Sequence, residues 1–133
     1  MAFPILETTR LSLDALKDSD SQSILELFSE PDVVSYYDLA AFSEEKQASN
    51  LIQFFANRFE TGEGIRWAIR LKGTRELVGT CGFNSWSPKM KSAIIGYDLQ
   101  KQHWGRGIVT EAVNAIIKTA FSGKLKCELP RLH

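Results

Sequence analysis

Positions 102 to 107 of the chain read Gln102-His103-Trp104-Gly105-Arg106-Gly107. The run before this segment, residues 93–99, is apolar and rich in β-formers, which favours a buried strand. The run after it, residues 108–121, carries apolar residues at the spacing of one helical face. A strand that leads through a glycine-containing turn into a helix presents backbone N–H groups at the positive end of the helix dipole. We therefore predict an anion-binding loop, whose glycines let the backbone approach a phosphate closely.

Two common nucleotide-binding motifs do not fit this loop. The Walker pattern needs Gly-Lys followed by Ser or Thr, and the dinucleotide fingerprint needs a third glycine where Thr110 stands. The remaining pattern, Gln-x-x-Gly-x-Gly, resembles the pyrophosphate loop with which the GNAT family of N-acetyltransferases holds acetyl-coenzyme A. The flanking segments Ile95-Gly96-Tyr97-Asp98-Leu99 and Thr110-Glu111-Ala112 are similar to the branch of that family that acetylates ribosomal-protein N-termini.

Composition places the chain among ordinary globular domains. Its 133 residues suffice for one core, so we predict a single domain over residues 1–133. Basic and acidic residues number 16 each, and no apolar run reaches the length of a membrane span, so we expect neither a nucleic-acid nor a membrane partner. The N-terminal residues lack the pattern of a secretion signal, and Cys81 and Cys127 have no metal-ligand spacing. These observations predict a reduced, cytoplasmic protein without a metal site.

Periodicity predicts the order strand, two helices, three strands, helix. Residues 10–16 alternate as a half-buried strand, and helices follow the cap residues at 18–20 and at Ser43. Residues 65–71, 77–86 and 92–99 read as a meander of strands, and residues 108–121 as a helix. The predicted class is α+β, with a mixed, mostly antiparallel sheet flanked by helices. This order is that of the front part of the acyl-CoA N-acyltransferase fold.

The resemblance covers residues 9–121. Members of the family continue with a fifth strand, a fourth helix and a final hairpin, whereas only residues 122–133 follow here. We therefore expect a C-terminally incomplete domain that lacks the final part of the fold. Loss of those strands would expose a sheet edge and apolar surface, which predicts a homodimer in which a second copy supplies the missing layer.

The resemblance implies a set of cofactor-binding residues. Backbone N–H groups of the loop would face the pyrophosphate, the strand edge before it would pair with the pantetheine arm, and an N–H near Leu99 would donate to the thioester carbonyl. The glycines could instead simply end a strand and start a helix, and Arg106 could point to solvent. His103 is interpreted as an exposed bystander rather than a base, and Trp104 as a packing residue. The predicted set is Tyr97, Leu99, Gln102, His103, Trp104, Gly105, Arg106, Gly107 and Ile108.

The acceptor side is less defined by sequence. Tyr36 and Tyr37 stand where relatives line the acceptor cleft, although they could equally be core anchors. Glu44, Glu45 and Glu111 are bases by residue type only, because acidic residues occur at helix starts for dipole reasons alone. No catalytic residue is therefore assigned, and Cys81 is interpreted as a packed strand residue without a His partner.

Two hypotheses follow. In the first, the chain is an enzyme that moves acetyl from acetyl-coenzyme A to a primary amine, either a ribosomal-protein or other protein N-terminus or a small amine. In the second, it is a truncated acetyltransferase-fold protein, weakly active or inactive, that binds coenzyme A or acts only as an oligomer. The loop and the element order support the first, and the short C-terminus supports the second.

Overall fold

A computed structural model describes residues 3–35, 40–87 and 92–121 of the chain. The predicted order of elements is confirmed, with a short strand before it and a short helix and two 3-10 turns between its members. The sequence-predicted bounds of three elements are exact, because local periodicity determines them. The elements are β1 (Leu6–Glu7), β2 (Leu11–Ala15), η1 (Asp18–Asp20), α1 (Ser21–Phe28), α2 (Pro31–Val34), α3 (Glu45–Thr61), β3 (Ile65–Leu71), β4 (Leu77–Ser87), β5 (Ser92–Leu99), η3 (Lys101–His103) and α4 (Ile108–Phe121).

The five strands form one sheet in the order β1-β2-β3-β4-β5. Every pairing between these strands is antiparallel, which confirms the α+β class with a mostly antiparallel sheet. The register between β4 and β5 shifts between Phe83 and Ser85, so that Asn84 is the extra residue of a β-bulge. Within the described residues, β1 and β5 are the two edge strands of the sheet, and β5 lies next to β4.

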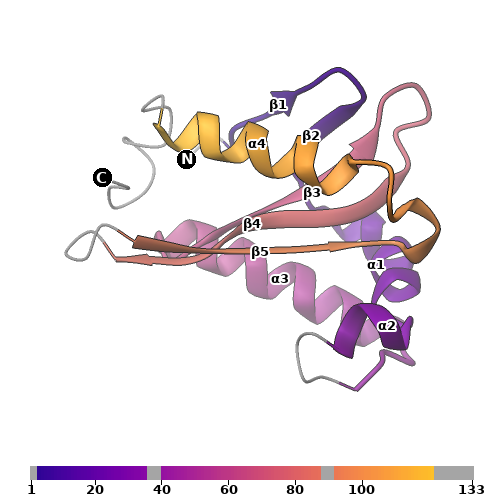
Figure 1. The fold of residues 1–133 in the computed structure, drawn as a ribbon. Coiled ribbons are helices and arrows are strands. Elements are labelled where there is room, and N and C mark those ends of the chain that lie inside the picture. The colour runs from indigo at the N-terminus through magenta and orange to yellow at the C-terminus, as the bar shows by residue number, and fades with distance from the viewer. Residues whose placement is uncertain (1–2, 36–39, 88–91, 122–133) are drawn as a thin grey trace.

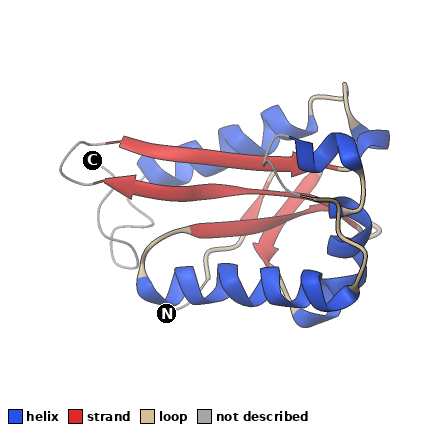
Figure 2. Cartoon of the chain, turned by 90° about the horizontal axis from the view of Figure 1, so that it is seen from below, coloured by secondary structure: helices blue, strands red, loops and turns tan. Residues whose placement is uncertain are grey.

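Helices cover both faces of the sheet (Figures 1 and 2). One core cluster lies between the sheet and α4, where Trp67 and Ile69 of β3 meet Ile116 of α4. A second cluster lies on the opposite face, where Ile24 of α1 and Ile52 of α3 pack against Ala68 of β3. Alternate residues of β3 therefore enter two different cores, and every residue of this central strand is buried except the half-buried Leu71.

This two-sided packing corrects the predicted half-buried first strand. Ser12 and Asp14, expected on a solvated face of β2, are buried like their apolar neighbours. Helix α3 also starts one residue later than predicted from Ser43, because Glu44 is the N-cap and forms a capping box with Gln47. Gly62 ends α3 as predicted, with a left-handed φ of 76°.

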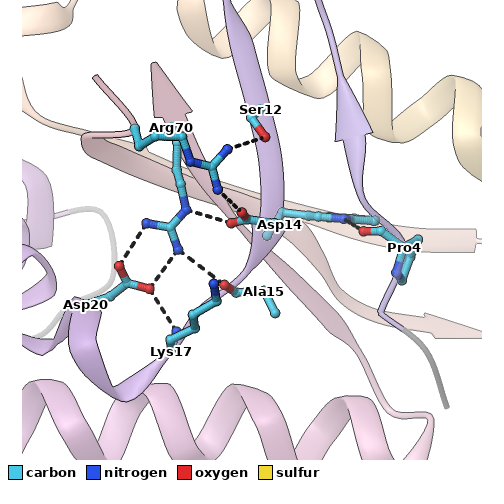
Figure 3. A network of polar contacts seen from close by, with 9 residues as sticks. Pro4, Ser12, Asp14, Ala15, Lys17, Asp20 and Arg70 are labelled. Carbon is cyan, nitrogen blue, oxygen red and sulfur yellow. Dashed lines mark hydrogen bonds and ion pairs between the residues drawn. The ribbon is translucent and has the colours of Figure 1, made fainter. Parts of the chain in front are cut away.

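Asp14, a buried polar residue of β2, is held by Arg70 of β3 (Figure 3). Arg70 Nε donates to Asp14 Oδ1 at 2.7 Å, and its two terminal nitrogens donate to the carboxylate of Asp20 at 2.8 Å. Burial alone would raise the pKa of Asp20, but hydrogen bonds from Arg70 and from the Lys17 backbone outweigh it and lower the pKa below 3.8. The hydrogen bonds to Asp20 and Asp14 in turn raise the pKa of Arg70. This cluster ties η1 to the centre of the sheet.

Some of the sequence-based expectations concern residues that the structure does not describe. These residues are Tyr36, Tyr37 and 122–133. Across the described ranges, no helix combines the length and apolarity needed to span a bilayer. The same ranges hold no group of three metal-ligating side chains close together.

Candidate active site

The loop between β5 and α4 has the backbone that its glycines predict. Gly105 and Gly107 adopt left-handed conformations, with φ of 78° and 74°. An added Cβ at Gly105 would meet nothing within 4 Å, so glycine is favoured there by backbone conformation rather than by crowding. Helix α4 begins at Ile108, directly after the second glycine. Its first N–H groups therefore open onto this loop, where the helix dipole favours an anion.

Arg10 and Glu111 fix the loop to the rest of the fold. Arg10 Nη1 donates to the Arg106 carbonyl at 2.9 Å, and Arg10 Nε lies 2.7 Å from Glu111 Oε1. Thr8 Oγ1 and the Arg10 N–H both donate to Glu111 Oε2. Burial would raise the pKa of Glu111, but these hydrogen bonds outweigh it and lower the pKa below 4.5. Glu111 is thus an ionised structural partner, in agreement with its interpretation from sequence, and a poor proton acceptor.

The loop opens into a cavity of about 720 Å³ that follows β5. One part of its wall comes from the loop and the start of α4, including Trp104, Gly105, Gly107 and Ile108. Another part comes from β5 itself, through residues 95–99, and from Asn84 of β4 and Val33 of α2. The cavity therefore joins an anion-binding end, at the helix start, to an extended strand edge. This shape suits an elongated ligand with a phosphate at one end.

Leu99 directs its backbone toward the outer side of β5. The next residue, Gln100, donates its N–H to Val78 O at 2.8 Å, and neighbouring residues of a strand face opposite sides. The Leu99 carbonyl accepts a hydrogen bond from Trp104 Nε1 at 2.8 Å on that outer side. Through this hydrogen bond Trp104 holds the loop against the end of β5. The residue is 42% exposed and also forms part of the cavity wall.

A buried polar network lies beneath the β5 side of the cavity. Arg66 of β3 donates from Nη2 to Asp98 Oδ2 at 3.0 Å, from Nε to Thr80 Oγ1 at 2.9 Å, and from Nη1 to Asn84 Oδ1 at 2.8 Å. The Thr80 backbone N–H and hydroxyl also donate to the Asp98 carboxylate. The Arg66 guanidinium lies 5.1 Å from the ring centroid of Phe55, a cation–π contact. Asp98 and Asn84 both line the cavity, so this network connects the core to the site.

The predicted cofactor-binding residues do not all line the cavity. Seven of the nine do, and the other two, Gln102 and Arg106, are exposed on the outer side of the loop. His103, expected to be exposed, is buried, because η3 turns its ring inward beside the strand end. His103 Nε2 lies 3.8 Å from Glu76 Oε2, and neither ring nitrogen has a hydrogen-bond partner within the described residues.

The remaining candidates are placed as structural residues. Glu44 caps α3, and Glu45 accepts a hydrogen bond from the Ser21 hydroxyl at 3.3 Å. Cys81 is fully buried, as expected for a packed strand residue, and this burial raises the pKa of its thiol to about 12. Sequence reasoning did not identify Arg66, Asn84 or Thr80. A charged residue within an otherwise apolar strand, as Arg66 is in β3, is the feature that could have pointed to this buried polar network.

Comparison with known proteins agrees with this geometry. A family profile described as acetyltransferase (GNAT) domain matches residues 10–133. The uncharacterised N-acetyltransferase YoaA of Bacillus subtilis is 39% identical over 120 residues, which cover 90% of this chain and 68% of that protein.

Solved structures show the same fold. A GNAT-family acetyltransferase of Bacillus anthracis matches with a TM-score of 0.78 and 21% identity, over 91% of this chain and 68% of its own. RimL, a ribosomal-protein alpha-N-acetyltransferase in complex with coenzyme A, matches with a TM-score of 0.74 and 22% identity, over 90% of this chain and 70% of its own. The chain thus spans about two thirds of the length of the relatives it matches.

Proposed function

Because this chain belongs to the GNAT family of acetyl-CoA-dependent N-acetyltransferases, we propose that it transfers acetyl to the α-amine of a protein or peptide N-terminus. The observation that carries the proposal is the single cavity that joins the glycine loop at the α4 start to β5 and the Arg66 network. The likeness to a ribosomal-protein acetyltransferase supports a peptide acceptor over other amines.

In this proposal the loop holds the pyrophosphate. Backbone N–H groups around Gly105, Gly107 and Ile108 supply the donors. The exposed side chain of Arg106, which belongs to the same loop, contacts a phosphate from outside the cavity. The outward-facing edge of β5, at Tyr97 and Leu99, pairs with the pantetheine arm as an added strand. Gln102 shapes the loop from outside the cavity, and His103 contributes to the cavity wall.

The bound thioester supplies an activated acetyl group. Its C–S bond breaks as a C–N bond forms to the neutral acceptor amine, the amine releases a proton, and the thiolate sulfur takes one up. The outward-facing N–H of Leu99 is the natural donor for charge that develops on the carbonyl oxygen. Tyr36 and Tyr37 remain predicted acceptor-cleft residues, and the homodimer and the cytoplasmic location remain predictions from sequence.

Cofactor binding is tested with two matched glycine variants. Gly105 and Gly73 both have left-handed φ, at 78° and 93°, and an added Cβ meets nothing within 4 Å at either position. Gly105→Ala and Gly73→Ala should therefore cost similar stability, about 1 kcal/mol. Only Gly105→Ala should weaken acetyl-CoA binding, because Gly73 lies in the turn between β3 and β4. Equal effects on binding would exclude the loop as the cofactor site.

Catalysis is tested by incubating the chain with acetyl-CoA and a short serine-initiated peptide. We expect a melting temperature that rises with acetyl-CoA concentration, equivalent to roughly 2.7 kcal/mol at a hundredfold excess over the dissociation constant. Mass spectrometry should then show one acetyl group at the peptide N-terminus. A stabilised chain that acetylates neither peptides nor simple amines would instead support the weakly active or inactive alternative.

A further inference from the structure

Asn84 is held in one orientation by groups around it. It is the extra residue of the β4 bulge, and bulges re-aim a side chain relative to the regular pleat. Its backbone carbonyl accepts a hydrogen bond from Arg58 Nη2, and its side-chain Oδ1 accepts from Arg66 Nη1 at 2.8 Å. Both the main chain and the side chain of this exposed residue are therefore fixed from the protein side.

Arg66 determines which amide atom Asn84 offers to the cavity. A guanidinium has donors and no acceptor, so the amide atom that it contacts must be the oxygen. Hydrogen bonds to Thr80 and Asp98 hold the Arg66 guanidinium in place, so its contact with Asn84 is maintained. The Nδ2 group, with its two N–H donors, is then the part of Asn84 that remains for a ligand. Asn84 lines the cavity, so these donors lie at its wall.

Gly96 provides the room for this arrangement. A Cβ built on Gly96 would lie 2.5 Å from Asn84 Nδ2 and 2.5 Å from Arg66 Nη1. The amide and the guanidinium thus lie directly over the β5 backbone, in the half of the cavity that is farther from the glycine loop. A cofactor arm that runs from the loop along β5 would place its reactive end in this direction.

From these contacts we infer that Asn84 is an acceptor-binding residue whose side-chain N–H donates to a carbonyl oxygen next to the acceptor amine. This inference rests on the proposed acetyltransferase function and narrows its substrate class. A peptide N-terminus or an amino-acid amide has such an oxygen, whereas a polyamine or an alkylamine has none. The chain should therefore prefer acceptors in which a carbonyl group follows the α-carbon of the amine.

The test compares two acceptors, alanine N-methylamide and sec-butylamine, which both carry the amine on a methyl-bearing carbon and of which only the first has a carbonyl next to it. Asn84→Ala removes the donors, and Asn84→Asp removes them while keeping an oxygen for Arg66. We expect both variants to raise KM for the amide about tenfold, the loss of one well-placed hydrogen bond, with kcat changed less than KM. KM for sec-butylamine should not rise with Asn84→Ala. Ratios of variant to wild type cancel the different basicities of the two amines.

Binding without turnover gives a second readout. Calorimetric titration of alanine N-methylamide into the chain saturated with coenzyme A should show a weaker dissociation constant for both variants. Ser85→Ala is the matched control, because Ser85 is the next residue of the bulge and does not line the cavity. It should leave both acceptors unaffected. Thermal melts of each variant identify any that fails to fold, and Asn84→Asp retains the Arg66 contact if Asn84→Ala does not fold.

The outcomes separate the inference from the proposed function. An equal rise in KM for both acceptors, or no change for either, would overturn the role of Asn84 while leaving the acetyltransferase in place. Acetylation of neither acceptor by the wild-type chain would overturn the proposed function itself. A preference of the wild-type chain for sec-butylamine over the amide, at equal concentrations of neutral amine, would contradict the inferred substrate class.

Discussion

Arg66 and Arg70 lie four residues apart on the same face of β3, and both are buried, yet their partners differ in kind. Arg70 pairs with two carboxylates, Asp14 and Asp20, which belong to the β2–η1 region and line no part of the cavity. Among the described residues, Arg66 pairs with one carboxylate, Asp98, and also donates to two neutral side chains, of which Asn84 reaches the cavity. One cluster joins elements of the fold, and the other extends from the core into the site.

The comparison shows that arginine has two different roles on the same strand. A central strand with helices on both faces has no solvated side, so any arginine on it must be fully paired. Where both partners of the guanidinium are carboxylates, as for Arg70, the ion pairs hold elements of the fold together. Where neutral groups share the guanidinium, its donors orient those groups, and an oriented amide is useful for recognition. Perturbation of the Arg70 cluster should therefore affect stability alone, and perturbation of the Arg66 cluster should affect acceptor binding as well.

The largest effect is expected from Arg70→Met. This change leaves the buried Asp20 without a guanidinium and Asp14 with only the exposed Arg75, and breaking a buried ion pair by removing one partner costs about 3–5 kcal/mol. Urea denaturation should show this loss, while the acetyl-CoA dissociation constant of the folded fraction stays unchanged.

Arg75→Met is the control for Arg70. Arg75 also pairs with Asp14, at 2.9 Å, but its side chain is 57% exposed. Exposed pairs contribute about 0–1 kcal/mol, so this variant should lose little stability. Similar losses for Arg70→Met and Arg75→Met would show that the Arg70 cluster is not the stabilising fixture that its burial indicates.

A smaller effect is expected from Gly96→Ala on the Arg66 side. The new Cβ would displace the guanidinium, the Asn84 amide or both, and such overpacking costs about 1–3 kcal/mol. Because Asn84 moves, KM for a peptide acceptor should rise as well, which is the contrast with Arg70→Met.

A double-mutant cycle sharpens this result. Asn84→Ala removes one of the two groups that the new Cβ would meet, so part of the cost of Gly96→Ala should disappear in the double variant. We expect a departure from additivity above about 0.5 kcal/mol in the free energy of unfolding. Strict additivity would mean that the Asn84 amide does not lie over Gly96 in solution.

The sequence predicts the elements of this fold well and its polar contacts poorly. Strands 65–71 and 92–99 and helix 108–121 have the bounds that periodicity predicts, because side-chain spacing along one element is a local property. The glycine loop is likewise local, and its left-handed backbone follows from glycine at two positions. The family resemblance rests on the same local segment, which is why it could be recognised.

Long-range contacts explain what the sequence did not reveal. Arg66 and Asp98 are 32 residues apart, and Arg70 and Asp14 are 56 apart, so nothing near any of them indicates a partner. Alternation alone assigns Arg66 and Arg70 to a solvated face, and only the helices on both sides of the sheet make that face buried. The bulge at Asn84 and the inward turn of His103 depend on pairing across strands, which residue order does not specify.

The smallest effect is expected from acid, and it concerns the Arg70 cluster. The pKa of Asp20 is lowered in the folded chain, because hydrogen bonds from Arg70 and Lys17 outweigh the burial that would raise it. A lowered pKa contributes stability that is fully present above the unfolded value near 3.8 and is lost as pH falls through the folded value. The free energy of unfolding should therefore decline from about pH 5 downward.

Asp20→Asn should be less stable at pH 7, and its free energy of unfolding should decline more gently in acid, because it lacks this titrating group. Urea melts of both chains from pH 7 to the lowest pH at which they fold measure the two slopes. Parallel slopes would show that Asp20 titrates alike in the folded and unfolded chains, and the Arg70 cluster would then not be the charge-dependent stabilising element that its ion pairs indicate.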